Sequence, residues 1–278
     1  MNTKKTVFLA IILMNLVIIL MSMKNLKAQS SNNETIMAKD GKPIAFYFIK
    51  HASLYFTYDG IVFYLDPVSY PHVDYGKLPK ADYILITHDH YDHLDTNAIG
   101  LIAKPTTEII CNQEVKNKLS KESTVLKNYA SVEFTIETVA AVTATMCDEN
   151  SSMSVDVTND TLLQNIEIKA FPAYNTTPER AVLFHPKERD NGYLVYIGGS
   201  CLYFAGDCED MPEMETIGEV DIAFLPINQP YTMTVEQAIH AAEMIKPQIL
   251  FPYHYGNTDL KGLEVLNEKG IKIIVKPM

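Results

Sequence analysis

The chain has 278 residues, 47% of them hydrophobic, which is enough for one α/β domain with a sizeable buried core. Its formal net charge is −11, and residues 1–28 contain lysines but no acidic residue, so the rest of the chain is more acidic than the whole. An acidic surface repels phosphate backbones, and no cluster of Lys and Arg marks a basic channel. We therefore expect no nucleic-acid partner and a small-molecule substrate instead. Composition leaves the oligomeric state open.

The N-terminus has the pattern of an export signal. Two lysines precede an uncharged run from Val7 to Met23, and Ala28 ends a loose small-residue cleavage site. The run also approaches the length of a membrane span, so an uncleaved anchor is the alternative. We predict a signal peptide or N-terminal anchor over 1–28, a polar linker over 29–43 and one domain over 44–278. The protein is then exported, either periplasmic or secreted, or attached to a membrane through this segment.

The first half of the domain is expected to open with an antiparallel meander and to continue with strand–helix alternation. Short runs rich in β-branched and aromatic residues are joined by tight-turn signals, and an apolar run at 83–86 suits a buried strand. Strands are predicted at 44–49, 53–57, 61–65, 83–86 and 108–111, and helices from near Asp95 and over 113–119.

The second half repeats the order of strands followed by helices. Residues 131–170 have no helical period and are predicted as strands, with a loop at 148–152. Further strands are expected at 193–197, 202–204, 222–225, 249–251 and 271–275, with helices over 235–245, ended by Pro247, and over 260–269.

Three histidines and an aspartate follow directly after the apolar strand at 83–86. His88 and His90 are two residues apart, so an extended backbone points both imidazoles to the same side, and Asp92 and His93 follow in the turn. Imidazole nitrogens and carboxylate oxygens are ligands that zinc prefers. The sequence therefore predicts a metal site at the end of this strand.

This H-x-H-x-D-H pattern after a strand resembles the signature of the metallo-β-lactamase superfamily. The segment Phe-Ala-Gly-Asp ending at Asp207 resembles the later motif of that superfamily, whose carboxylate bridges two metals. The segment Pro-Tyr-His-Tyr-Gly around His254 resembles its final histidine motif. The resemblance extends over most of the chain and implies an α/β fold, the four-layer αββα sandwich, with metals at one edge between the two sheets.

Two smaller features resemble one branch of the superfamily. They are Asp66-Pro67 and the Tyr-Thr-Met segment from Tyr231, which precedes a helix. The branch contains ascorbate-6-phosphate lactonases and N-acyl phosphatidylethanolamine phospholipases D. His51 matches a histidine that recurs near the start of this branch, where a supporting or packing role is expected rather than ligation.

One position departs from the family pattern. The family usually places a third histidine for the first metal after the strand at 166–171, and this chain has Asn175 there. Asparagine is a poor zinc ligand. Either the first site is weaker or another group fills it, and His185 is the nearest candidate, weighed equally against a structural histidine in a loop.

The resemblance implies a metal-dependent hydrolase with one or two zinc ions, or manganese or iron, whose bound hydroxide attacks a carbonyl or phosphoryl centre. The ligand set it implies is His88, His90 and, as the open candidate, His185 for one ion, Asp92, His93 and His254 for the other, and Asp207 between them. Asp92 and Asp207 are the predicted catalytic residues, with Asp92 able to carry a proton to the leaving group.

The substrate class stays open among esters, lactones and phosphodiesters, because a fold does not choose among them. A β-lactamase is a lower-ranked alternative, since Asn175 and the lactonase-like motifs count against it. A non-enzymatic metal-binding scaffold of the same fold is the second class of interpretation.

Overall fold

The computed structural model describes residues 32–139 and 161–278. The predicted signal or anchor segment at 1–28 and the predicted loop at 148–152 lie outside the described residues. Within the two described ranges, no helix is both long enough and apolar enough to cross a membrane.

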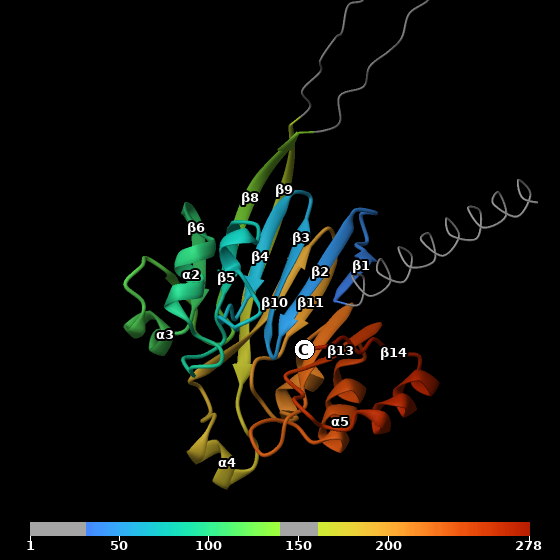
Figure 1. Cartoon of the computed structure of the whole chain (residues 1–278). Coiled ribbons are helices and arrows are strands. Elements are labelled where there is room, and N and C mark those ends of the chain that lie inside the picture. The colour runs from blue at the N-terminus through green and yellow to red at the C-terminus, as the bar shows by residue number, and fades with distance from the viewer. Residues whose placement is uncertain (1–31, 140–160) are drawn as a thin grey trace, which may run out of the picture.

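The first of two seven-stranded sheets comes from the first half of the chain (Figure 1). Its strands, in both spatial and chain order, are β1 (Asn33–Met37), β2 (Pro43–Lys50), β3 (Ser53–Tyr58), β4 (Ile61–Leu65), β5 (Ala81–Leu85), β6 (Ala103–Cys111) and β7 (Thr124–Val125). Strands β1 to β4 pair antiparallel, which confirms the predicted meander, and β4 to β7 pair parallel.

The second sheet comes from the second half of the chain. Its strands are β8 (Ser131–Val139), β9 (Thr161–Ala173), β10 (Asp190–Ile197), β11 (Ser200–Phe204), β12 (Ile222–Pro226), β13 (Ile249–Tyr253) and β14 (Lys272–Ile273). Strands β8 to β11 pair antiparallel, and β11 to β14 pair parallel. Both halves thus change from antiparallel to parallel pairing, and each contains strands followed by helices, the repeated order that was predicted.

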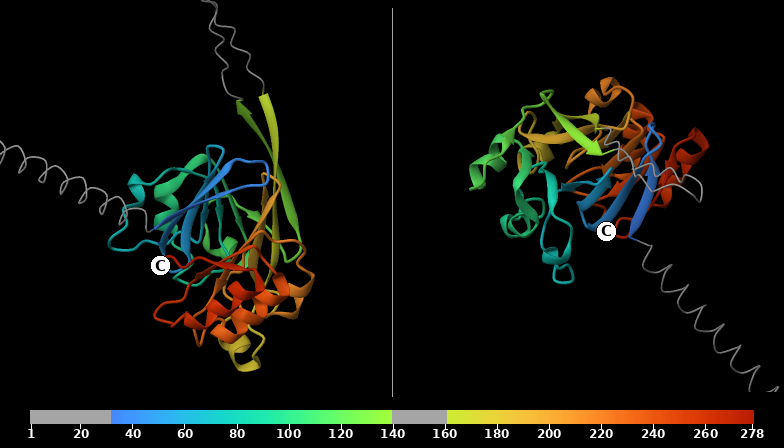
Figure 2. Two further views of the ribbon diagram at one scale, coloured as in Figure 1. Left: turned by 90° about the vertical axis from the view of Figure 1, so that its right-hand side faces the viewer. Right: turned by 90° about the horizontal axis from the view of Figure 1, so that it is seen from above.

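Helices cover the outer faces of the two sheets, as the view from above in Figure 2 shows. On the first sheet lie α2 (Thr96–Ile102) and α3 (Gln113–Lys118), and on the second lie α5 (Val235–Ile245) and the 3₁₀ helix η3 (Lys261–Lys269). The short elements η1 (Tyr75–Lys77), η2 (Pro212–Thr216) and α4 (Pro178–Leu183) lie in the connections. The order helix, sheet, sheet, helix is the four-layer αββα sandwich that was predicted.

Aromatic side chains fill the space between the sheets. Phe46 of the first sheet lies 5.4 Å from Phe224 and 5.8 Å from Phe251 of the second, measured between ring centroids, and Phe56 lies 5.7 Å from Phe204. All five rings are buried. Burial of such a side chain contributes about 1.5–3 kcal/mol, so this cluster holds the sheets together firmly enough to set the geometry at their shared edge.

The expected linker over 29–43 is wrong in part, because Asn33–Met37 forms strand β1. Its register pairs Asn33 with Tyr47 and Met37 with Pro43 of β2. An edge strand needs only one row of backbone hydrogen bonds and little apolar surface, and Ile36 alone packs against the core. A polar composition therefore did not exclude a strand here. The helix expected over 260–269 is the 3₁₀ helix η3.

Candidate metal centre

The candidate ligands follow the ends of strands. His88 comes after β5, Asp207 after β11 and His254 after β13, while His51 stands in the turn between β2 and β3. These ends lie at one edge of the sandwich, between the two sheets. The sequence predicted this edge through its resemblance to the metallo-β-lactamase superfamily, which implies metals at one edge between the two sheets.

The first donor group contains His88, His90 and His185. One ring nitrogen from each lies within 4.8 Å of the others. The centroid of the His185 ring is 4.8 Å from both the His88 and the His90 ring. The geometry thus brings His185, which is buried, to the place where a third imidazole is needed, and of its two open interpretations it supports the candidate ligand.

Asn175 contacts the loop that carries His185. Its backbone N–H donates to the carbonyl of His185 at 2.9 Å, and its side-chain amide donates to the carbonyl of Tyr231 at 2.9 Å. Asn175 therefore holds the segment that carries His185, where the family pattern has a ligand.

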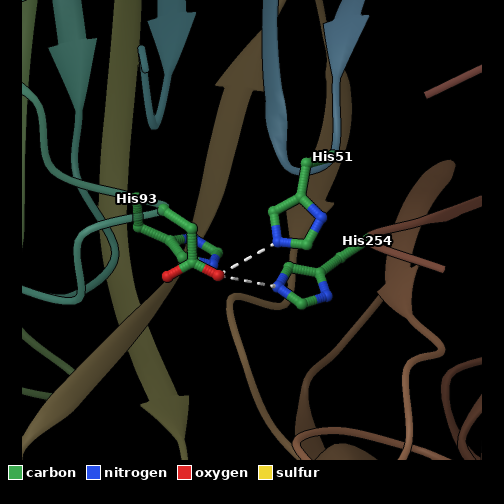
Figure 3. A group of neighbouring side chains, drawn as sticks. His51, His93 and His254 are labelled. Carbon is green, nitrogen blue, oxygen red and sulfur yellow. Dashed lines mark hydrogen bonds and ion pairs between the residues drawn. The ribbon is translucent and has the colours of Figure 1, made fainter. Parts of the chain in front are cut away.

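The second donor group contains His51, Asp92, His93 and His254 (Figure 3). The Asp92 carboxylate lies 3.1 Å from Nε2 of His51 and 3.9 Å from Nε2 of His254. The His51 and His254 ring centroids are 3.6 Å apart. His51 is closer to the other side chains of this group than a packing role requires. The sequence signal for a place at the site was its position after an apolar strand, which it shares with His88.

The Asp207 carboxylate lies between the two groups. Its Oδ1 is 3.4 Å from Nε2 of His93, and its Oδ2 is 3.2 Å from Nε2 of His254 and 3.6 Å from Nε2 of His185. One carboxylate thus reaches ligands of both groups, which is the position that a bridging role requires.

Buried side chains contact the imidazoles on the side away from the site and orient the rings. Asp66 accepts hydrogen bonds from Nδ1 of His93 at 2.8 Å and from the backbone and hydroxyl of Thr87 at 2.8 and 2.7 Å. The Thr87 oxygen also lies 2.9 Å from Nδ1 of His88, and Asp190 lies 3.1 Å from Nδ1 of His185. With Nδ1 held, Nε2 of each ring faces the site, which is the arrangement that metal-binding histidines need.

The backbone is strained at three of these positions. His51, Asp66 and His254 have φ angles of 61°, 41° and 49°, a region that non-glycine residues rarely adopt. The N–H of His254 donates to the carbonyl of His51 at 3.0 Å, which links the two sheets at the site. Such strain costs on the order of 1–3 kcal/mol per residue and clusters at functional sites.

The histidines differ in the charge that they carry before a metal ion binds. Burial lowers the pKa of His254 to about 4 and lowers the pKa of His88 well below 6.5, so both are neutral donors at pH 7. Burial acts the same way on His93, but the Asp207 and Asp66 carboxylates outweigh it and raise its pKa well above 6.5. His93 therefore gives up a proton when a metal ion binds.

Among the described residues at this edge, four buried atoms that could bind a metal have no hydrogen-bond partner: Nε2 of His88, His93 and His254, and Oδ1 of Asp207. Oδ1 of the neighbouring Asn175 has none either. Buried polar atoms are almost always satisfied, and leaving one without a partner costs about 1–3 kcal/mol. Four of them converging from three different strand ends fit one or two metal ions. A cavity of about 440 Å³ opens onto this group, which makes it accessible to a small molecule.

Comparison with known proteins agrees with this geometry. Residues 63–255 match the family model described as the beta-lactamase superfamily domain. A UPF0173 metal-dependent hydrolase from Nanoarchaeum equitans is 29% identical over 216 residues, covering 74% of this chain and 86% of the relative. One from Methanosarcina mazei is 32% identical over 185 residues, covering 65% and 69%. A solved structure of a metal-dependent hydrolase from Parabacteroides distasonis is 43% identical, with a TM-score of 0.73, covering 88% of this chain and 98% of that one.

The chain therefore belongs to the beta-lactamase superfamily, with the metallo-β-lactamase fold. Within that superfamily its relatives are metal-dependent hydrolases, which confirms the predicted enzyme class. The finer resemblance to the lactonase and phospholipase branch stays a prediction.

Proposed function

We propose that this protein hydrolyses a small-molecule substrate at a two-metal site. The observation that carries the proposal is the set of two donor groups joined by Asp207, with four buried donor atoms left without partners. Metal ions bound there would lower the pKa of a coordinated water toward 7 and polarise the substrate's carbonyl or phosphoryl oxygen.

The residues divide into two ligand sets in this proposal. The sets are His88, His90 and His185 on one side, and Asp92, His93 and His254 on the other, with Asp207 between them. His51, which also lies in the second donor group, holds the Asp92 carboxylate at 3.1 Å. Histidine-rich sites with carboxylates and no thiolate suit zinc first, and manganese or iron as alternatives.

Asp92 is the candidate for moving the proton. Burial opposes its charge, but the hydrogen bond from His51 and the positive His93 outweigh burial and lower the pKa of Asp92 to about 2. Asp92 is therefore a carboxylate at neutral pH, half-buried beside the cavity, and can accept a proton from the attacking water before passing it to the leaving group.

Metal content tests the ligand assignment. Elemental analysis of the purified full chain should find about two ions per chain, and His185→Ala should lose one of them. The matched variant His72→Ala should keep both, because His72 is an exposed histidine that belongs to neither donor group. Two ions retained in His185→Ala would refute the first ligand set.

Turnover separates the remaining alternatives. Chelation should abolish hydrolysis, added metal should restore it, and Asp207→Ala should remove it while the protein stays folded. Two bound ions with no turnover on a broad ester and phosphodiester panel would favour the metal-binding scaffold instead. Rapid hydrolysis of a chromogenic cephalosporin would favour the β-lactamase.

We further propose export, on the pattern of residues 1–28. Mass spectrometry of the protein from fractionated cells would find the mature N-terminus near residue 29 outside the cytoplasm if the segment is a cleaved signal. An intact chain in the membrane fraction would identify an anchor.

A further inference from the structure

Exposed apolar side chains gather around the mouth of the metal cavity. Tyr91, Leu183 and Tyr231 line it and are 88%, 71% and 45% exposed. Phe184 also lines it, with its ring centroid 5.1 Å from that of Tyr231. Single exposed apolar residues are ordinary, but several around one cavity mark a ligand-contacting surface. We call Tyr91, Leu183, Phe184 and Tyr231 the apolar wall.

No lysine or arginine is among the described residues that line the cavity. The nearby guanidinium groups are already paired, Arg180 with Glu209 at 2.6 Å and Arg189 with Asp190 at 2.8 Å. Sites that select a substrate carboxylate or phosphate normally offer such a group, because its fork matches the anion. A substrate with an anionic group away from the metals therefore finds no lysine or arginine partner among the described residues of the lining.

The apolar wall is held in place by the segment that carries His185. Leu183 ends α4 two residues before His185, and α4 buries no side chain of its own. Its start is tied down by Glu209, which is buried and accepts hydrogen bonds from Thr177 and Arg180. Leu183 and Phe184 are therefore tied to the segment that carries His185, and a group lying on them lies beside the reacting centre.

A second hydrogen bond fixes the other half of the wall. The side-chain amide of Asn175 donates to the carbonyl of Tyr231 at 2.9 Å, while its backbone N–H holds the carbonyl of His185. The residue that departs from the family pattern thus joins the loop of the third imidazole to the loop of the wall.

We propose that the substrate is an uncharged carboxylic ester or lactone whose apolar acyl or aryl group packs on the wall, an inference that rests on the proposed hydrolytic function. In the reaction, the oxygen of water forms a bond to the acyl carbon, and the bond from that carbon to the alcohol oxygen breaks. One water proton ends on the alcohol oxygen, and the acid product releases the other to solvent.

The dependence of turnover on the length of the substrate's acyl chain tests whether the apolar wall binds the substrate. With p-nitrophenyl acetate, butyrate and hexanoate, kcat/KM of the metal-loaded full chain should rise about two- to fourfold per added methylene, and bis-p-nitrophenyl phosphate should be the poorest substrate. Leu183→Ser should flatten the rise. The control Leu163→Ser, at a 65% exposed leucine of β9 away from the cavity, should leave it unchanged. Preference for the phosphodiester, or no chain-length dependence in the wild-type protein, would overturn the inference.

Binding without turnover separates this inference from the proposed function. The affinity of metal-loaded protein for alkyl hydroxamic acids, measured by calorimetry, should rise from acetohydroxamic to octanohydroxamic acid in the wild type and stay flat in Leu183→Ser. If no ester is hydrolysed but this rise is found, the hydrolytic function fails while recognition of an apolar group stands. Equal affinities along the series would overturn the inference even in an active esterase.

Discussion

Asp66→Asn is the sharpest test of how the site is supported. Asp66 is fully buried and accepts hydrogen bonds from His93 and from two donors of Thr87. An asparagine of the same shape has one acceptor and one donor atom, so in either orientation its NH₂ faces a donor. We expect the metal-free protein to lose about 1–3 kcal/mol of stability, the cost of one unsatisfied buried group.

The larger effect is expected on metal affinity. If the new NH₂ group faces Nδ1 of His93, that nitrogen has to accept, and the ring proton moves to Nε2, which points at the site. Loss of a partner that orients a ligand costs about 10–100-fold in metal affinity, or about 1.4–2.8 kcal/mol. The affinity is measured by competition with a chromophoric chelator.

A matched control separates this effect from a general loss of charge. Asp74→Asn makes the same substitution at an exposed residue that caps η1, where Asp74 accepts from the N–H of Gly76. It should leave metal affinity unchanged. If Asp66→Asn binds metal within about twofold of the wild type, the proposed control of the His93 proton is refuted.

Two further predictions concern the stability of the protein. First, His254 has a pKa of about 4 in the folded protein against 6.5 in the unfolded chain, so between these pH values only the unfolded chain binds the proton. The free energy of unfolding of the metal-free protein should therefore fall by up to about 3 kcal/mol as the pH falls from 6.5 to 4. His88 acts in the same direction, while the stabilisation from His93, whose pKa is raised, is lost only as the pH rises above 6.5. Urea denaturation with chelator at pH 7, 6 and 5 measures the slope, and His254→Gln should flatten it; an equal slope in that variant would contradict the assignment. Second, Glu209→Ala should cost about 2 kcal/mol in the same assay and speed proteolysis at α4, because Arg180 and the donors of Thr177 lose their acceptor; the exposed control Glu264→Ala should do neither.

The amino-acid sequence alone determined the parts of the protein that depend on local pattern. Alternating apolar residues and turn signals predicted the meander of β2 to β4, and the apolar run at β5 predicted the strand that delivers His88 and His90. Residues two apart on an extended chain face the same side wherever that chain is packed. The predicted positions of Asp207 and His254 rested on the resemblance of their segments to superfamily motifs, together with their places after strands.

Tertiary structure alone decided which distant side chains complete the donor groups. The sequence left open whether His185 is a ligand or a structural histidine, and only the pairing of β9 with β10 brings the loop between these strands to the end of β5. His51 reaches Asp92 because strand pairing in the first sheet places the β2–β3 turn and the end of β5 at the same end, and the hydrogen bond from His254 to His51 joins this group to the second sheet. Strand β1 was missed because its partner β2, and not its own composition, makes it a strand. Such contacts depend on strand order across the whole sandwich, which local periodicity does not specify.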